Sequence, residues 1–176
     1  MKHFAFFLCL LFSVFSLSAQ YQIDYWENNN KRSEGNLIDG KKDSIWIYYH
    51  SNGIKWMEGS YKNDQRVGNW KSWYSNGQLW SDFYPETGSF KSWYPDGTPE
   101  SVGAFKNYMK EGEWIFYHDN AVISKKCRYE KDSLEGLCEE FHPNGKRSFK
   151  GYYHNNELQD IGTWWYDNGN LEMQGK

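Results

Sequence analysis

The sequence is poor in the features that mark membrane proteins, nucleic-acid-binding proteins and most enzymes. Its 176 residues include 20 Lys and Arg against 23 Asp and Glu, and a net charge of −3 argues against a basic nucleic-acid binder. A mean hydropathy of −0.92 excludes a protein with several membrane spans. There is no Gly-x-Ser-x-Gly segment and no glycine loop that could cradle a phosphate, so the common catalytic motifs are missing.

Aliphatic side chains are scarce as well. After residue 19 the sequence holds 17 Leu, Ile and Val but 30 Phe, Tyr and Trp. An aromatic content of 20% is too high for a disordered chain, and the length suits one domain. We therefore expect a folded domain whose core consists mainly of aromatic rings, many of which carry a polar group.

The longest apolar run lies at the start of the chain. Residues 1–19 have a Lys beside the first Met, an apolar stretch from Phe4 to Leu17, and small residues up to Ala19. This layout is typical of a secretory signal peptide, with a retained anchor helix as the alternative, although the run is short for a membrane span. We expect one domain over 20–176, no stable membrane span after cleavage, and export to the periplasm, the cell envelope or the medium.

A short pattern recurs along the rest of the chain. The segment GNWKSWYSNG at 68–77 returns as GSFKSWYPDG at 88–97. Asn-Gly or Asp-Gly between runs rich in Tyr, Trp and Phe is a strong hairpin signal, and we expect a two-residue type I′ turn at each copy. Asn120-Ala121 is the exception, because Ala is strained at positive φ and favours another turn type. The first residues of the turn pairs are at positions 52, 76, 96, 120, 144 and 168.

Two-residue loops determine which residues face each other across neighbouring strands. On one face we expect Gly to alternate with Trp in much of one row, so that a large ring lies over a neighbour without a side chain. The members of this row are Gly35, Trp46, Gly59, Trp70, Phe83, Phe90, Gly103, Trp114, Cys127, Cys138 and Gly151. The opposite face is expected to carry a second row of rings, which includes Tyr49, Trp56, Trp73, Trp80, Trp93 and Tyr117.

The repeated frame is Gly-x-Trp-x-x-Tyr-x-x-Asn-Gly, and a further Gly follows six residues after the turn, as at Gly59, Gly103 and Gly151. Over residues 25–176 this frame resembles the bacterial variant of the MORN repeat. The resemblance implies an all-β fold, an elongated single-layer antiparallel meander of repeated β-hairpins. It also implies roles as a scaffold, as a partner-binding surface or in lipid contacts. Bacterial members are often classed as antitoxins, a role that export makes less expected here.

Residues with catalytic or metal-binding potential do not gather into a recognisable site. His50, His118 and His142 occupy a repeat position that Tyr fills elsewhere, so we expect them to pack as strand-end rings rather than to bind zinc. Basic clusters at 125–128 and 146–150 could grip a nucleic acid, but charges on a sheet also prevent unwanted strand pairing. We predict no catalytic residues, no metal, no cofactor and no nucleic-acid partner.

The second row of rings is the expected binding surface. It would be a platform of Tyr49, Trp73, Trp93 and Tyr117, with Trp56 and Trp80 as the nearest further rings. Packing along the sheet is the alternative role for these rings. We predict a non-catalytic, exported interaction or scaffold module with an unknown protein or glycan partner. A glycan- or lipid-binding envelope protein is the alternative, and an antitoxin-like protein or an unrecognised enzyme is less expected.

Two cysteines remain after the first 19 residues. Cys127 stands at the repeat position of Gly103, and Cys138 at that of Trp114. The expected register places the two directly opposite each other on adjacent strands, where a disulfide is feasible and would persist in an exported protein. Two reduced cysteines that fill the space of the lost ring are the alternative.

Overall fold

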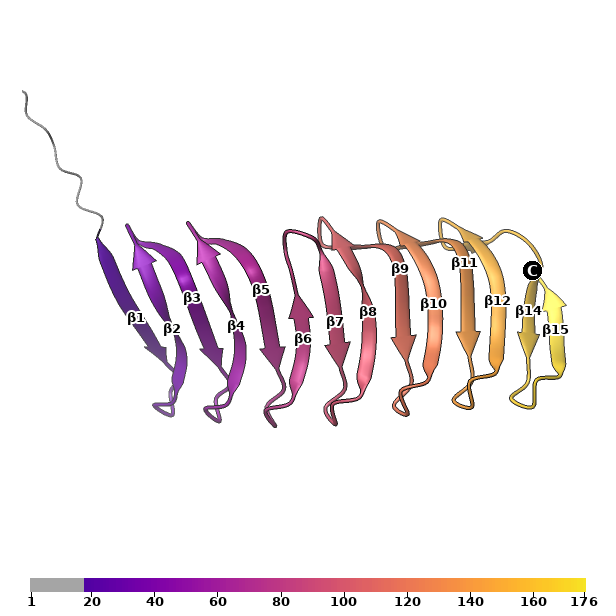
Figure 1. Ribbon diagram of the computed structural model, residues 1–176, viewed down its shortest axis with the longest axis horizontal. Helices are drawn as coiled ribbons and strands as arrows, with labels where there is room; N and C mark the ends of the chain where they lie inside the picture. The colour runs from indigo at the N-terminus through magenta and orange to yellow at the C-terminus, as the bar shows by residue number, and fades with distance from the viewer. Residues whose placement is uncertain (1–17) are drawn as a thin grey trace, which may run out of the picture.

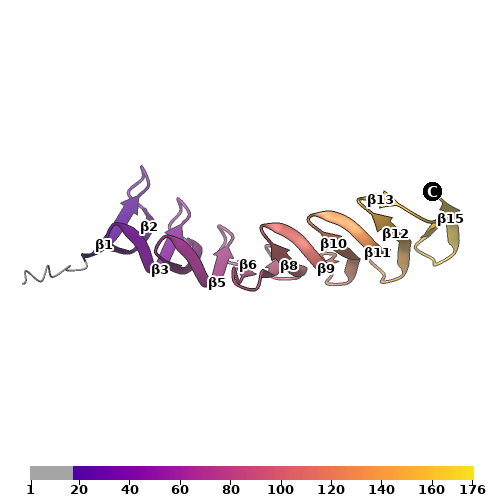
Figure 2. The same ribbon diagram turned by 90° about the horizontal axis from the view of Figure 1, so that it is seen from above.

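The protein is a single twisted antiparallel sheet, as the computed structural model shows for residues 18–176 (Figure 1). Each strand pairs with its neighbour in chain order from β1 to β12, then β14 and β15, while the short β13 pairs with β12. Seen from above, the hairpins follow one another in single file along the long axis (Figure 2). The predicted all-β, single-layer meander is confirmed, and none of the described residues is helical.

Most strands have eight or nine residues, but β6 and β7 have five each. The strands are β1 (Ala19–Tyr25), β2 (Lys31–Ile38), β3 (Lys41–Tyr49), β4 (Lys55–Lys62), β5 (Gln65–Trp73), β6 (Leu79–Phe83), β7 (Ser89–Trp93), β8 (Pro99–Lys106), β9 (Met109–Tyr117), β10 (Ile123–Glu130), β11 (Ser133–Phe141), β12 (Arg147–His154), β13 (Glu157–Leu158), β14 (Gly162–Trp165) and β15 (Leu171–Gly175).

The sheet has two different edges. The turns of the seven hairpins lie along one edge, the lower one in Figure 1, which we call the turn edge. The connections between these hairpins lie along the other, which we call the tip edge. The strand pairs that these connections join, such as β4–β5 and β6–β7, are hairpins of the opposite direction. The hairpins expected from the repeat are all present, and they are β1–β2, β3–β4, β5–β6, β7–β8, β9–β10, β11–β12 and β14–β15.

The turns themselves differ from the prediction. At the turn edge the Gly53 N–H donates to the His50 carbonyl at 2.9 Å, and Gly53, but not Asn52, has positive φ. This is a type I turn followed by a left-handed residue, so the expected type I′ turn is wrong here. Ala121 adopts φ 62° and makes the equivalent bond to His118 at 2.9 Å, so its turn is of the same kind as the others.

Two consecutive residues with positive φ, as in type I′ turns, occur instead at the tip edge. Asn63 and Asp64 have φ values of 51° and 66°, and Lys131 and Asp132 have 49° and 67°. None of these four residues is a glycine. The Asn-Gly pairs therefore marked the correct hairpins, but the type I′ turns that we expected there lie at the tip edge instead.

The central row of the predicted register is confirmed. Trp46 pairs with both Gly35 and Gly59, and Cys127 pairs with Cys138. Nearer the turn edge the longer loop adds one residue, so the register shifts by one. Tyr49 therefore pairs with Lys55 rather than with Trp56.

The same one-residue shift occurs in the next hairpin, where Trp73 pairs with Leu79 rather than with Trp80. The ring of Trp56 lies 6.4 Å from that of Tyr48 and 6.2 Å from that of His50, between ring centroids. Tyr48 is on the opposite face from Tyr49, so the expectation that Trp56 continues the row of Tyr49 is wrong.

The core lies on one face of the sheet, which we call the tryptophan face after Trp46, Trp70 and Trp114. These three side chains are 2% exposed or less. Each covers a glycine so closely that a Cβ atom at Gly59 would lie 2.2 Å from Cδ2 of Trp70. Glycine is therefore required in these strands by the ring that covers it. The opposite face, which carries Tyr49 and Trp73, is called the platform face.

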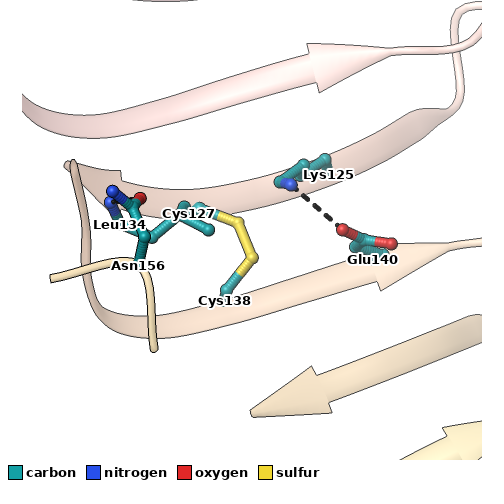
Figure 3. Close-up of a disulfide and its surroundings, with 6 residues drawn as sticks. All are labelled: Lys125, Cys127, Leu134, Cys138, Glu140 and Asn156. Carbon is teal, nitrogen blue, oxygen red and sulfur yellow. Dashed lines mark hydrogen bonds and ion pairs between the residues drawn. A yellow bond between two sulfur atoms is a disulfide. The ribbon is translucent and has the colours of Figure 1, made fainter. Parts of the chain in front are cut away.

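Cys127 on β10 and Cys138 on β11 form a disulfide on the tryptophan face (Figure 3). Both are 1% exposed and pack near Phe149. The bond lies where the repeat elsewhere places a Trp over a Gly, so a covalent link replaces a ring contact in the core.

The signal peptide predicted for residues 1–19 lies, apart from residues 18 and 19, outside the described part of the chain. Strand β1 begins at Ala19, at the predicted cleavage point. Over 18–176 the search for a helix long and apolar enough to cross a membrane finds none.

Candidate functional site

Polar side chains tie each hairpin to the next along the turn edge. His50 Nε2 lies 2.9 Å from the carbonyl oxygen of Trp73, and the Tyr74 hydroxyl donates to the carbonyl of Trp93 at 3.0 Å. His118 and His142 make the equivalent contacts at 2.8 and 2.7 Å. The three repeat histidines are therefore structural, as the repeat position predicts. Within the described residues, no three His, Cys, Asp or Glu side chains are grouped as a metal site.

A second set of bonds, which we call the tip ladder, runs along the tip edge. The Asp64 N–H donates to the Lys42 carbonyl at 3.0 Å, and the Lys42 N–H donates to Asp64 Oδ1 at 2.8 Å. Asp132 makes the same two bonds with Lys110, at 3.1 and 2.7 Å. An aspartate at the tip of one hairpin thus satisfies both backbone groups of a residue in the preceding hairpin. Its carboxylate accepts from the N–H, and its own backbone N–H donates to the carbonyl.

The tip ladder is interrupted at the middle of the sheet. Arg66 stands at the same repeat position as Lys42 and Lys110, two residues after a tip turn. The next hairpin, β6–β7, is too short to reach the tip edge, so among residues 18–176 no turn side chain bonds the Arg66 backbone. Tyr108 occupies the turn position of Asp64 in the following tip, and it is 92% exposed.

The short hairpin leaves a cleft of about 720 Å³ between the two neighbouring tips, which we call the notch. A groove of about 320 Å³ adjoins it on the tryptophan face and shares Arg66, Phe83, Phe105 and Tyr108 with it. Ser72 and Ser81 line this groove, and their small side chains leave room where other strands carry rings. The notch is lined by Tyr61, Asp64, Gln65, Arg66, Phe83, Pro85, Gly88, Phe105, Asn107 and Tyr108.

Arg66 has no carboxylate partner among the described residues, whereas Lys125, also on the tryptophan face, pairs with Glu140 at 3.0 Å. Arg66 lies over the Trp70 ring at 4.3 Å. Because a guanidinium stacked on a ring keeps its N–H groups at its edge, Arg66 remains able to bind an anion.

The indole of Trp70 is an exception among the buried tryptophans. Trp46 Nε1 donates to the carbonyl of Asn36 at 2.9 Å, and Trp114 Nε1 donates to that of Ala104 at 3.0 Å. Trp70 Nε1 is buried and has no hydrogen-bond partner in the described part of the chain. Trp70 lines the groove beside the notch, so an unused donor lies close to this surface.

The structure brings the predicted residues Tyr49, Trp73, Trp93 and Tyr117 to the platform face on alternate strands, where each is half-buried. Burial and the carboxylate of Glu34, which accepts the Tyr49 hydroxyl at 2.5 Å, raise the pKa of Tyr49 to about 12. Binding by these rings remains a prediction.

Trp56 and Trp80 do not join these rings in the pairing, although they are 42% and 41% exposed. Sequence reasoning missed the notch. Its signal was the single 20-residue spacing between the turn pairs at 76 and 96.

Comparison with known families agrees with the repeat seen in the sheet. Segments 42–63, 66–84, 86–107 and 134–155 match the model of the MORN repeat variant. No curated protein matches the chain. The notch lies where the second and third matches meet, and the unmatched stretch from 108 to 133 contains a hairpin with the same geometry as the others. The chain thus carries segments that match the MORN repeat variant at four positions, and proteins with MORN repeats are generally non-enzymatic.

Proposed function

We propose that the protein is a non-catalytic binding module that acts outside the cytoplasm and holds a partner protein in the notch. The observation that carries this proposal is the interruption of the tip ladder. There, aromatic rings, a cation without a carboxylate and free strand backbone face one cleft. These are the kinds of group that dominate protein–protein recognition.

The repeat architecture supports binding rather than catalysis. Near-equivalent hairpins offer extended surfaces, whereas catalysis needs one asymmetric group of side chains held rigidly. In the described residues, Nε2 of His50, of His118 and of His142 each bonds to a backbone carbonyl. Export is supported by the layout of residues 1–19 and by the disulfide between Cys127 and Cys138, a bond that persists in oxidising compartments.

The test is a pull-down from an extract of the producing cells with three forms of the protein. The wild type is compared with a notch variant, Arg66→Gln with Tyr108→Ala, and with a platform variant, Trp73→Ala with Trp93→Ala. Circular dichroism and thermal unfolding first establish that each variant is folded. We expect the notch variant to lose a partner that the wild type and the platform variant both capture. Equal capture by all three forms would show that the notch does not bind the partner.

A glycan-binding role is the second candidate, because the half-buried Tyr49, Trp73, Trp93 and Tyr117 share the platform face. This role predicts the opposite outcome when the same three forms are tested for glycan binding. The platform variant would lose binding to a soluble glycan array, while the notch variant would retain it.

A further inference from the structure

We propose that the notch receives an extended segment of the partner protein that carries an aspartate, and that this aspartate bonds to Arg66 as Asp64 bonds to Lys42. The inference rests on the proposed function and names the chemistry of the partner. The partner would supply the hairpin tip that β6–β7 lacks.

The backbone of Arg66 is oriented for this bond. Lys42 pairs with Leu37 and Arg66 pairs with Tyr61, each at the second pair beyond a two-residue tip turn. The N–H and C=O groups of a strand alternate between its two neighbours. Since those of Lys42 reach the next tip, those of Arg66 face the notch, where a strand edge without a partner is a template for an added chain.

The size of the notch corresponds to a missing piece of chain. Gly68 and Gly88 occupy equivalent places with φ values of 66° and 73°. The connection that leads to Gly68 in the regular unit contains the seven residues 61–67. The equivalent connection that leads to Gly88 in the short unit contains only the three residues 85–87. A cleft of about 720 Å³ lies within the ordinary range for a bound ligand of several groups.

The charges favour a carboxylate. The Gly68 N–H on β5 already has a carboxylate partner from the short connection, because it donates to Glu86 Oε1 at 2.5 Å. Glu86 does not reach Arg66, which lies two residues closer to the tip edge. A carboxylate at Arg66 could accept from its backbone N–H and also meet its guanidinium, and such charge-assisted bonds are about twice as strong as neutral ones.

The first experiment uses a synthetic peptide as the probe. A peptide with the sequence of residues 60–67, flanked by two added cysteines and cyclised through their disulfide, carries the tip aspartate, and a matched peptide carries Ala in place of Asp64. Binding to the ¹⁵N-labelled protein is followed through the amide shifts of Arg66 and Tyr108. We expect the Asp peptide to shift both signals and to bind at least about tenfold more tightly than the Ala peptide.

The control is a notch-filled variant, in which a copy of residues 61–67 replaces 85–87 and restores the regular unit. The peptide should no longer bind to this variant. Equal binding of the two peptides, binding to the filled variant, or no shift at Arg66 up to millimolar peptide would each overturn the inference. If these occur while the notch variant still loses its partner in the pull-down, the aspartate assignment fails and the proposed function stands.

A second measurement avoids the need for a free peptide to fold. In the notch-filled variant the inserted tip carries its own aspartate opposite Arg66, and a companion variant carries Ala there. We expect the Arg66 amide to exchange with solvent at least about tenfold more slowly with Asp than with Ala. Equal exchange in two folded variants would show that the notch does not recognise a tip aspartate.

Discussion

Individual backbone angles decide where a side chain is tolerated in this sheet. Ala121 holds φ 62° at a turn position where the equivalent residues Gly53 and Gly145 have φ values of 85° and 81°. A Cβ atom destabilises this conformation by about 1–2 kcal/mol. A Gly at this position would recover only part of that energy, because Gly also has more conformational freedom in the unfolded chain. The turn therefore forms because its hydrogen bonds and strands require it.

Ala121→Gly is expected to raise the free energy of unfolding by about 0.5–1 kcal/mol, because it relieves positive-φ strain. Urea unfolding followed by tryptophan fluorescence measures the change. The matched control, Gly145→Ala, should lower the free energy of unfolding by a similar amount. A neutral effect of both changes would show that the turns are not held at positive φ.

A second prediction at the residue scale concerns the exposed ion pair between His154 Nδ1 and Glu135 Oε1, 3.0 Å apart. The Glu135 carboxylate raises the pKa of His154, and the hydrogen bond to His154 lowers the pKa of Glu135. The stabilisation from His154 is full below the ordinary histidine pKa and is lost as the pH rises through the raised value. The exposed pair is expected to contribute little to stability.

NMR titration of the His154 ring tests this pair. Glu135→Gln should bring the pKa of His154 down towards its ordinary value, whereas Glu157→Gln removes a weaker influence and should change it less. An unchanged titration in Glu135→Gln would mean that the two side chains do not meet in solution.

At the scale of the hairpin, stability depends on rings that lie flat against glycines. Gly59→Ala would place a Cβ atom 2.2 Å from Cδ2 of Trp70. We expect this overpacking to lower the free energy of unfolding by about 1–3 kcal/mol, as measured by urea unfolding. Gly175→Ala is the control, because its Cβ atom would meet nothing within 4 Å. Comparable losses in both variants would indicate a general effect of strand glycines instead.

The β10–β11 pair uses a covalent link in place of such a ring. Cys127 and Cys138 are 11 residues apart in the sequence. Reduction should lower the free energy of unfolding by about 2–3 kcal/mol, because the unfolded chain gains freedom when this loop opens. Urea unfolding with and without reductant measures the loss, and the variant Cys127→Ser with Cys138→Ser should not respond to reductant. Two reactive thiols in the unreduced, unfolded protein without residues 1–19 would contradict the disulfide.

Over the whole molecule, a single-layer sheet opens most easily where the pairing between neighbouring strands is least stable. Strands β6 and β7 have five residues each, against eight or nine for most of their neighbours, and their tip makes no ladder bond of the kind between Asp64 and Lys42. In a repeat array each unit is held only by its neighbours, so local opening concentrates at the poorest interface.

Among strands β2 to β12, hydrogen exchange is therefore expected to be fastest in β6 and β7. Mass spectrometry of the exchanging protein should resolve this hairpin from the units on either side. The notch-filled variant provides the comparison, since its longer hairpin should regain protection. Uniform exchange along the sheet would show that the short hairpin is no weaker than the rest.

Part of the candidate site was within reach of sequence reasoning. The irregular 20-residue unit was visible as spacing, and the rings Tyr49, Trp73, Trp93 and Tyr117 were correctly placed on one face. The notch was not predicted, because it arises from what two separate tips leave uncovered. Trp56 was misplaced because one extra loop residue moves a strand end by one position, and in a sheet that exchanges faces.

The sequence by itself determined the strands, their order and the Gly–Trp row, because these depend on local patterns with a constant period. It also brought Cys127 opposite Cys138, since pairing follows from the distance of each residue to the same turn. Only the tertiary structure decided the turn types, the face of Trp56 and the isolation of Arg66. These depend on backbone angles and on contacts between hairpins, which a residue's neighbours in the chain do not specify.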